Sequence, residues 1–141
     1  MGPHWFVFLL GVVLMASFAI YSYFRFWALY STFMKFAFSF VVPLEFILYF
    51  VTALKNPGMI SRSVPTFGKG KTICRDCLTT ETDKAFHCDD CGICIKGHDH
   101  HCIWSGQCIG EGNFTWFILF VACTPAFFVT LFLGSLSVAT G

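Results

Sequence analysis

Seven cysteines and four histidines lie between residues 74 and 108 of this 141-residue chain. The stretch HDHHCIWSGQC, residues 98–108, alone contains three of the histidines and two of the cysteines. Cysteine thiolates and histidine imidazoles are the side chains that zinc prefers in structural sites. The same two side chains also make the nucleophile–base pairs of covalent catalysis. The residue types therefore indicate metal binding, catalysis, or both within one short segment.

The spacing of the cysteines favours zinc as the main occupant. Two residues separate Cys74 from Cys77, Cys88 from Cys91, and Cys91 from Cys94, which lets paired sulfurs reach one ion. Structural zinc takes a tetrahedral set of four ligands, so the eleven candidates fill two sites and leave three residues over. A third site would need more ligands than the segment has. The count alone does not identify the three residues left over.

The sequence Asp99-His100-His101-Cys102 offers a second kind of chemistry. A carboxylate that orients an imidazole, which in turn activates a thiol, is the arrangement of a catalytic triad. An aspartate beside a histidine could equally hold a zinc-bound imidazole in place from the second shell. The local sequence does not decide between these two roles.

The elements that must position these residues are strongly apolar. Hydrophobic residues make up 56% of the chain, charged residues only 12%, and the mean hydropathy is +0.69. Apolar runs at residues 5–24, 36–54 and 115–138 are long enough to cross a bilayer of about 30 Å. The predicted fold is therefore an α-helical polytopic membrane protein with three transmembrane helices and a small irregular, zinc-stabilised cysteine-rich domain.

The distribution of lysine and arginine predicts the orientation in the membrane. Residues 55–114 contain seven of these cations, whereas the 25–35 loop contains two, so the positive-inside rule places the larger segment in the cytosol. The predicted order is given by residue range: 1–24, first helix; 25–35, short lumenal loop; 36–54, second helix; 55–114, cytosolic cysteine-rich domain; 115–138, third helix; 139–141, lumenal tail.

Two further features of the charge pattern limit the possible functions. Residues 55–114 also contain seven acidic residues, so the domain is neutral overall and is not a basic nucleic-acid surface. Glu45 lies near the middle of the second predicted helix, where an ionisable residue is by default a functional candidate. We expect instead a protonated glutamate that is hydrogen-bonded inside the helix bundle.

The motif at residues 99–102, Asp-His-His-Cys, within this cysteine spacing and followed by Cys108 and Asn113, resembles the DHHC family of membrane protein S-acyltransferases, or palmitoyltransferases. The resemblance is close over about residues 74–117. It implies two structural zinc ions. One set would be Cys74, Cys77, His87 and Cys94, and the other Cys88, Cys91, His101 and Cys108. The residues left over are then His98, His100 and Cys102.

The resemblance also implies an activity and its partners. Cys102 would be the nucleophile, His100 its base and Asp99 the residue that orients the base, while His98 has no implied role and is expected to be solvated. Cys102 would take an acyl group from palmitoyl-CoA or another long-chain acyl-CoA and pass it to cysteines of membrane-associated proteins. The implied location is the lipid bilayer of ER or Golgi endomembranes or of the plasma membrane.

Some positions depart from the family pattern. Ile103, Ser105 and Gly106 stand where proline, valine and asparagine are usual, which predicts a looser loop around the nucleophile, and Asn56 replaces the usual aspartate. The chain resembles a family member cut after its third transmembrane helix, without the fourth helix and the C-terminal region. The alternative function is therefore a catalytically impaired membrane zinc module, or an accessory partner that associates with another chain of the family.

Overall fold

The computed structural model describes residues 2–60, 74–78 and 85–139. Residues 61–73 and 79–84, which carry part of the positive charge used to predict the orientation, lie outside the described residues, as do residues 140–141 of the predicted tail.

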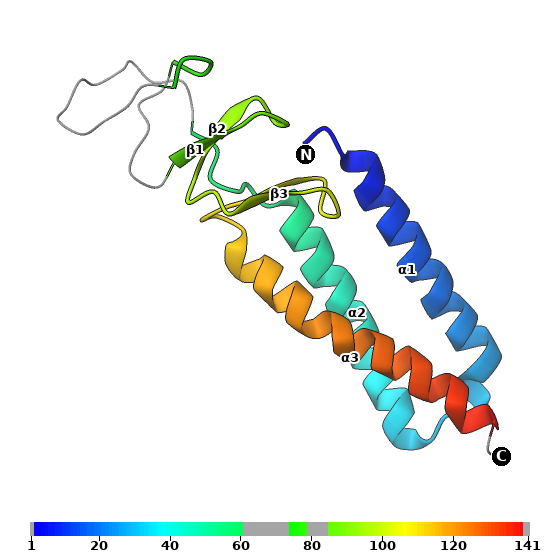
Figure 1. The fold of residues 1–141 in the computed structure, drawn as a ribbon. Coiled ribbons are helices and arrows are strands. Elements are labelled where there is room, and N and C mark those ends of the chain that lie inside the picture. The colour runs from blue at the N-terminus through cyan, green and yellow to red at the C-terminus, as the bar shows by residue number, and fades with distance from the viewer. Residues whose placement is uncertain (1, 61–73, 79–84, 140–141) are drawn as a thin grey trace.

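Three long helices make up most of the described chain (Figure 1). Helix α1 runs from Trp5 to Phe26, a 3-10 turn η1 spans Trp27–Leu29, α2 covers Thr32–Leu54, and α3 covers Phe114–Ala139. All three helices are long and apolar enough to cross a membrane, which confirms the predicted fold class. The bilayer core offers no water to backbone N–H and C=O groups. A single segment that crosses it forms a helix, because a helix makes all of its backbone hydrogen bonds within the segment.

The connection between α1 and α2 is shorter than a loop over residues 25–35 would be. The end of α1, the turn η1 and the first residues of α2 occupy this range and leave Tyr30 and Ser31 between them. The Ser31 hydroxyl accepts the backbone N–H of Met34 at 3.3 Å and so caps the start of α2. The two helices are therefore antiparallel and joined by a short connection (Figure 1).

Helix α3 packs mainly against α2, and α1 makes further contacts with both (Figure 1). Phe127 and Leu131 of α3 meet Phe38 and Tyr30 in one buried cluster. A second cluster, formed by Phe8, Tyr49 and Ala53, lies between α1 and α2. The remaining large apolar side chains of the helices are mostly exposed, as expected for surfaces that face lipid.

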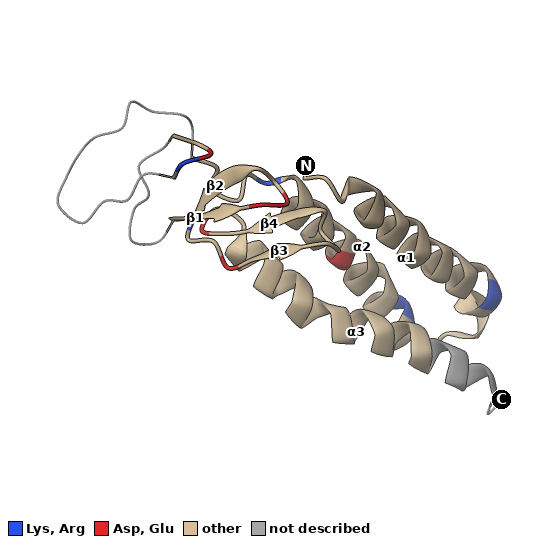
Figure 2. Cartoon of the chain, turned by 45° about the horizontal axis from the view of Figure 1, so that its top comes forward, with Lys and Arg blue, Asp and Glu red and all other residues tan. Residues whose placement is uncertain are grey.

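Glu45 is the one acidic residue of the described helices, and it is fully buried (Figure 2). The hydroxyl of Thr124 on α3 lies 2.7 Å from its Oε1 atom, so the pair joins α2 to α3 inside the bundle. This contact matches the hydrogen-bonded packing role that the sequence favoured for Glu45.

Two short β-hairpins form the compact domain at one end of the helices, beside the N-terminus (Figure 1). Strand β1, Ala85–Cys88, pairs antiparallel with β2, Ile93–Lys96, and β3, His100–Cys102, pairs antiparallel with β4, Gln107–Ile109. Most of the charged residues of the described chain lie on this part (Figure 2). Such short strands need outside support, because a two-stranded hairpin alone is marginally stable in water.

The C-terminal end of α2 provides part of that support. Gln107 donates its amide hydrogens to the carbonyls of Thr52 and Lys55, both at 2.9 Å. Asn113, fully buried directly before α3, donates to the carbonyls of Thr52 and Cys108 and accepts the N–H of Gly110. The last carbonyls of a helix have no hydrogen-bond partner within it. The side-chain amides of Gln107 and Asn113 therefore supply partners for carbonyls at the end of α2 and attach the hairpin domain to that helix.

Candidate functional site

The structure brings together the first predicted ligand set. One ligand atom from each of Cys74, Cys77, His87 and Cys94 lies within 4.8 Å of the others. The Nδ1 atom of His87 faces the three sulfurs at 3.4, 3.2 and 3.8 Å, respectively. Cys74 and Cys77 come from a turn, while the other two residues face each other across the β1–β2 hairpin.

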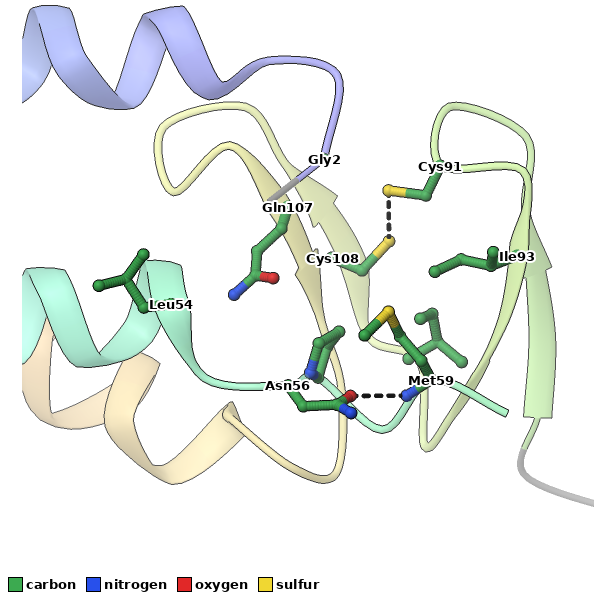
Figure 3. Close-up of a pocket in the computed structure, with 10 residues that line it drawn as sticks. Gly2, Leu54, Asn56, Met59, Cys91, Ile93, Gln107 and Cys108 are labelled. Atoms are coloured by element: carbon green, nitrogen blue, oxygen red, sulfur yellow. Dashed lines mark hydrogen bonds between the residues drawn. The ribbon is translucent and has the colours of Figure 1, made fainter. Parts of the chain in front are cut away.

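The second predicted set is assembled in the same way. Cys88, Cys91, His101 and Cys108 place one ligand atom each within 4.8 Å of the others. His101 and Cys108 are direct partners in the β3–β4 hairpin. Figure 3 shows the sulfurs of Cys91 and Cys108 pointing toward each other, 3.5 Å apart.

The β1–β2 hairpin contributes to both sets because neighbouring strand residues point to opposite faces. His87 belongs to the first set, and Cys88, the next residue, belongs to the second. The turn of the same hairpin supplies Cys91 to the second set, and β2 returns Cys94 to the first. Loss of either ion is therefore expected to disturb the other site.

The geometry of both sets fits tetrahedral zinc. Zn–S bonds of about 2.3 Å and Zn–N bonds of about 2.1 Å at tetrahedral angles place sulfur about 3.6 Å from nitrogen. The observed sulfur–nitrogen distances are 3.2–3.8 Å in the first set and 3.3–3.6 Å in the second. Three cysteines and one histidine are also a common ligand set of closed structural zinc sites.

Burial of the second set disfavours the charged thiolate forms of its cysteines, and a bound cation would offset this effect. Burial raises the pKa of the Cys91 and Cys108 thiols above their ordinary values and lowers the pKa of the His101 imidazole. In the first set, backbone N–H groups from Cys77 and then Asp76 lower the pKa of Cys74. Since neutral thiols must lose protons to bind zinc, affinity at the second set is expected to fall as pH falls.

His100 and Cys102 lie apart from the metal sets. They are two residues apart on β3, so they share one face of the strand, while His101 between them faces the sulfurs. The Nδ1 atom of His100 lies 2.7 Å from Oδ2 of Asp99, and its ring meets Phe117 edge-on at 5.1 Å. The pairing leaves Nε2 as the free nitrogen of His100.

A cavity of about 710 Å³ opens beside these residues among the three helices. His100, Cys102 and Trp104 line it at the hairpin domain, and its other walls are mainly apolar side chains of α1 and α3, together with Glu45 and Tyr49 of α2. The arrangement can hold a long apolar group with one end at the Cys102 sulfur. Cys102 itself is buried.

Ser105 and Gly106, two of the departures from the family pattern, take part in the contacts of the loop that follows Cys102. The buried hydroxyl of Ser105 lies 3.3 Å from the carbonyl of Cys102, and Tyr49 of α2 donates to the carbonyl of Trp104 at 2.7 Å. Gly106 has φ of +69°, a conformation that glycine adopts without strain. These contacts hold the loop in this chain, and a looser loop than in other family members stays a prediction.

Asn56 likewise replaces the usual aspartate without loss of a turn. Its side-chain oxygen accepts the N–H group of Gly58 at 2.8 Å and that of Met59 at 2.9 Å. Figure 3 shows the bond to Met59. An amide oxygen accepts these bonds as a carboxylate oxygen would. The turn therefore carries the chain from α2 into the hairpin domain in spite of the substitution.

Several residues at the site were not found from the sequence. Tyr49 and Gln107 hold the loop after Cys102 through contacts that span 55 residues, and local spacing gives no signal for them. His98, expected to be solvated, is half-buried, with its Nε2 atom buried. It belongs to neither metal set.

Comparison with known proteins identifies the family of this chain. A model of the family described as DHHC palmitoyltransferase matches residues 68–140. The chain is 39% identical over 66 residues to palmitoyltransferase ZDHHC15 of Xenopus laevis, which covers 44% of this chain and 20% of that protein. It is 31% identical over 113 residues to palmitoyltransferase ZDHHC13 of Homo sapiens, with 70% and 17% covered.

The chain is also similar to a plant protein. Over 86 residues the chain is 36% identical to probable protein S-acyltransferase 3 of Arabidopsis thaliana, covering 57% of this chain and 21% of the relative. The chain thus spans only about a fifth of the length of these curated relatives. Because the family match covers more than half of the chain and includes both ligand sets from Cys74 onward, the chain belongs to the DHHC palmitoyltransferase family.

Proposed function

We propose that this chain is a membrane protein S-acyltransferase that moves a long-chain acyl group from an acyl-CoA, such as palmitoyl-CoA, to cysteines of membrane-associated proteins. The observation that carries the proposal is the position of Cys102 and His100 on the wall of an apolar cavity among three membrane-spanning helices. A thiol that opens onto a lipid-like cavity suits a reaction that transfers a lipid chain.

The reaction has two balanced steps. The Cys102 thiolate attacks the thioester carbonyl of acyl-CoA, the carbon–sulfur bond to CoA breaks, and CoA leaves as its thiol after protonation. A cysteine thiolate of the substrate protein then attacks the new Cys102 thioester and takes the acyl group. Cys102 is regenerated as the leaving thiolate. No oxidant, reductant or further co-substrate is needed.

Asp99 and His100 supply the proton transfers. The Asp99 carboxylate, 2.7 Å from Nδ1 of His100, fixes the proton on that nitrogen and leaves Nε2 to accept the proton of Cys102. The edge-on contact with Phe117 holds the ring in the cavity wall. Positioned proton transfer of this kind contributes roughly 10²–10⁴-fold to a rate.

The two metal sets act on the fold and not on the reacting bond. Each offers a closed set of four protein ligands, which is the pattern of structural zinc. Bound zinc would cross-link the two hairpins and thereby hold β3, with His100 and Cys102, against the cavity. The ligands we assign are Cys74, Cys77, His87 and Cys94 for one ion, and Cys88, Cys91, His101 and Cys108 for the other.

The helices provide the place for the acyl chain. Aromatic and aliphatic side chains of α1 and α3 make up most of the cavity wall, and Glu45 and Thr124, which are hydrogen-bonded to each other, also line it. Each methylene moved from water into such a site gains about 0.8 kcal/mol. Burial of the chain can therefore offset the cost of ordering the acyl-CoA at Cys102.

We further propose that the hairpin domain faces the cytosol of an endomembrane or the plasma membrane, where acyl-CoA is available. Asn113-Phe114-Thr115 is a glycosylation sequon, but its modification cannot test this orientation. Asn113 is fully buried and hydrogen-bonded, so it would stay unmodified whichever side of the membrane it faced. A Phe86→Cys variant can, since Phe86 on β1 is exposed. In microsomes sealed with their cytosolic face outward, an impermeant maleimide is expected to label it. Protection until the vesicles are opened would contradict the orientation.

The direct test of the activity is acylation of the purified chain. We expect incubation with an alkyne analogue of palmitoyl-CoA to label the protein through a thioester that neutral hydroxylamine cleaves. Peptide mass spectrometry should then place the label on Cys102. Cys123, which lies within α3, and the six cysteines among the proposed zinc ligands act as internal controls for nonspecific transfer.

Two results would overturn this function. The label could be absent although the chain binds two zinc ions, or it could lie on another cysteine. The first result, together with co-purification of a longer family member, would favour the accessory zinc module instead.

A further inference from the structure

The N-terminal segment contacts the second metal set from the far end of the sequence. The Nδ1 atom of His4 lies 2.9 Å from Nε2 of His101, although 97 residues separate them. The two rings meet edge-on, with centroids 5.1 Å apart. His4 is not one of the proposed ligands, so the contact needs its own explanation.

The hydrogen bond has a defined direction if His101 binds zinc. Nδ1 of His101 faces the sulfurs of Cys88, Cys91 and Cys108 at 3.3–3.6 Å, so this nitrogen is the one available to the ion. The proton of the neutral imidazole then lies on Nε2. Nε2 of His101 donates to Nδ1 of His4, which accepts.

Backbone contacts hold His4 at this position. The N–H of Gly2 donates to the carbonyl of Gly106 at 2.8 Å, and the carbonyl of His4 accepts the N–H of Val7 at the start of α1. A Cβ atom on Gly106 would lie 3.1 Å from the His4 carbonyl oxygen, and one on Gly2 would lie 2.7 Å from the Gly106 carbonyl. Glycine on both sides lets the two segments approach this closely.

The N-terminal segment also lies close to the cysteine sulfurs of the second metal set. Figure 3 shows Gly2 beside Gln107 and on the side of Cys91 and Cys108. A Cβ atom on Gly2 would be 3.2 Å from the Cys91 sulfur. Residues 2–5 therefore touch the ligand set and the nucleophile loop together.

The first metal set has a different arrangement. Nε2 of His87 lies 3.8 Å from Oδ1 of Asp89, a fully exposed carboxylate two residues away. That partner is local and solvated, whereas His4 is part-buried and comes from another element. The two sites therefore offer an internal comparison within one molecule.

We propose that His4 is a positioning residue of the second zinc site, which accepts a hydrogen bond from the ligand His101 and couples the start of α1 to that site. Hydrogen-bond partners of this kind fix the tautomer and orientation of a metal-bound imidazole, and their loss commonly costs about 10- to 100-fold in metal affinity. The inference rests on the zinc assignment made under the proposed function and not on acyl transfer.

Chelator competition on the full chain tests the proposal site by site. The zinc-loaded protein is titrated with a chelator, and freed thiols are labelled with a maleimide and mapped by mass spectrometry. In His4→Phe, which keeps a ring but has no acceptor, Cys91 and Cys108 should become labelled at about 10- to 100-fold lower chelator concentration. Because the β1–β2 hairpin serves both sites, Cys77 and Cys94 of the first site should shift in the same direction but by a smaller factor.

Two matched variants separate the acceptor from packing. His4→Asn keeps an acceptor oxygen close to the place of Nδ1 and should restore most of the zinc retention. Leu9→Ala truncates an exposed side chain farther along α1 and should leave both sites unchanged. The proposal is overturned if His4→Phe retains zinc like the wild type, if both sites weaken equally, or if His4→Asn is as weak as His4→Phe. Since the measurement is zinc retention, an inactive but zinc-loaded wild type would refute only the proposed function.

Discussion

Replacing Cys102 with serine is expected to abolish both the hydroxylamine-sensitive label and transfer of the acyl group to a substrate protein. Serine has nearly the same size, so the β3–β4 hairpin and the cavity should persist, but its hydroxyl is far weaker as a nucleophile than a thiolate. Loss of the covalent nucleophile lowers kcat by roughly 10⁶ in a well-studied protease. Transfer by the variant should therefore lie below detection.

The matched control is Cys123→Ser, because Cys123 is the remaining cysteine outside both metal sets. It lies in α3 and does not line the described cavity. This variant should label like the wild type. If Cys102→Ser still forms a cleavable thioester at the wild-type level, Cys102 is not the nucleophile and the proposed mechanism is wrong.

Removal of the proposed base, His100, is expected to slow the labelling of Cys102 without abolishing it. His100→Gln keeps a polar side chain beside Asp99 but cannot accept and return a proton at neutral pH. The rate of Cys102 labelling should fall by roughly 10²–10⁴, the usual contribution of a positioned base. The loss should shrink at alkaline pH, since thiols then ionise without the help of a base.

Removal of zinc is expected to unfold the hairpin domain. Structural zinc contributes about 10–16 kcal/mol to the folding of small zinc domains, more than most domains of ordinary size have in total stability. The four strands are only three or four residues long, and the third buried cluster of the protein consists of Cys88, Cys108 and Ile95 with few neighbours. Little else can hold these hairpins together once the ions leave.

The measurement is zinc content by mass spectrometry, combined with limited proteolysis of the hairpin domain in detergent. The wild type should carry two zinc ions per chain. His101→Ala should lose at least one and become sensitive to protease, and His87→Ala should do the same because the β1–β2 hairpin serves both sites.

His98→Ala is the matched control for these substitutions. It removes a histidine from the same stretch that belongs to neither ligand set, so it should keep two ions and its protease resistance. Two zinc ions bound by His101→Ala would contradict the ligand assignment. The helices should remain folded in every variant, since the bilayer or detergent stabilises them independently.

The spacing of the cysteines predicts part of the metal-site architecture. Pairs such as Cys74 and Cys77 must lie close in any fold, because two intervening residues allow only a tight turn. Counting candidates against four ligands per ion therefore predicted two sites and three residues left over. The assignment of His87 and Cys88 to different ions depends on strand geometry, which spacing alone does not contain.

The same limit applies to His100 and His101, which are identical in type and adjacent in the chain. Alternation along β3 directs one toward the sulfurs and the other, with Cys102, toward the cavity. That alternation could have been inferred only if a strand had been predicted at residues 100–102. A three-residue strand with no apolar periodicity leaves no such signal.

The sequence by itself determined the membrane-spanning helices, the number of metal sites and the family, because apolar length and ligand spacing are local properties of the chain. Only the tertiary structure decided how the hairpin domain sits on the helices. Tyr49 holds the nucleophile loop, Gln107 and Asn113 hold the end of α2, and His4 reaches His101 across 97 residues. The reason is physical: each of these contacts forms where two separately folded elements meet, so it depends on their packing and leaves no pattern in the sequence of either one.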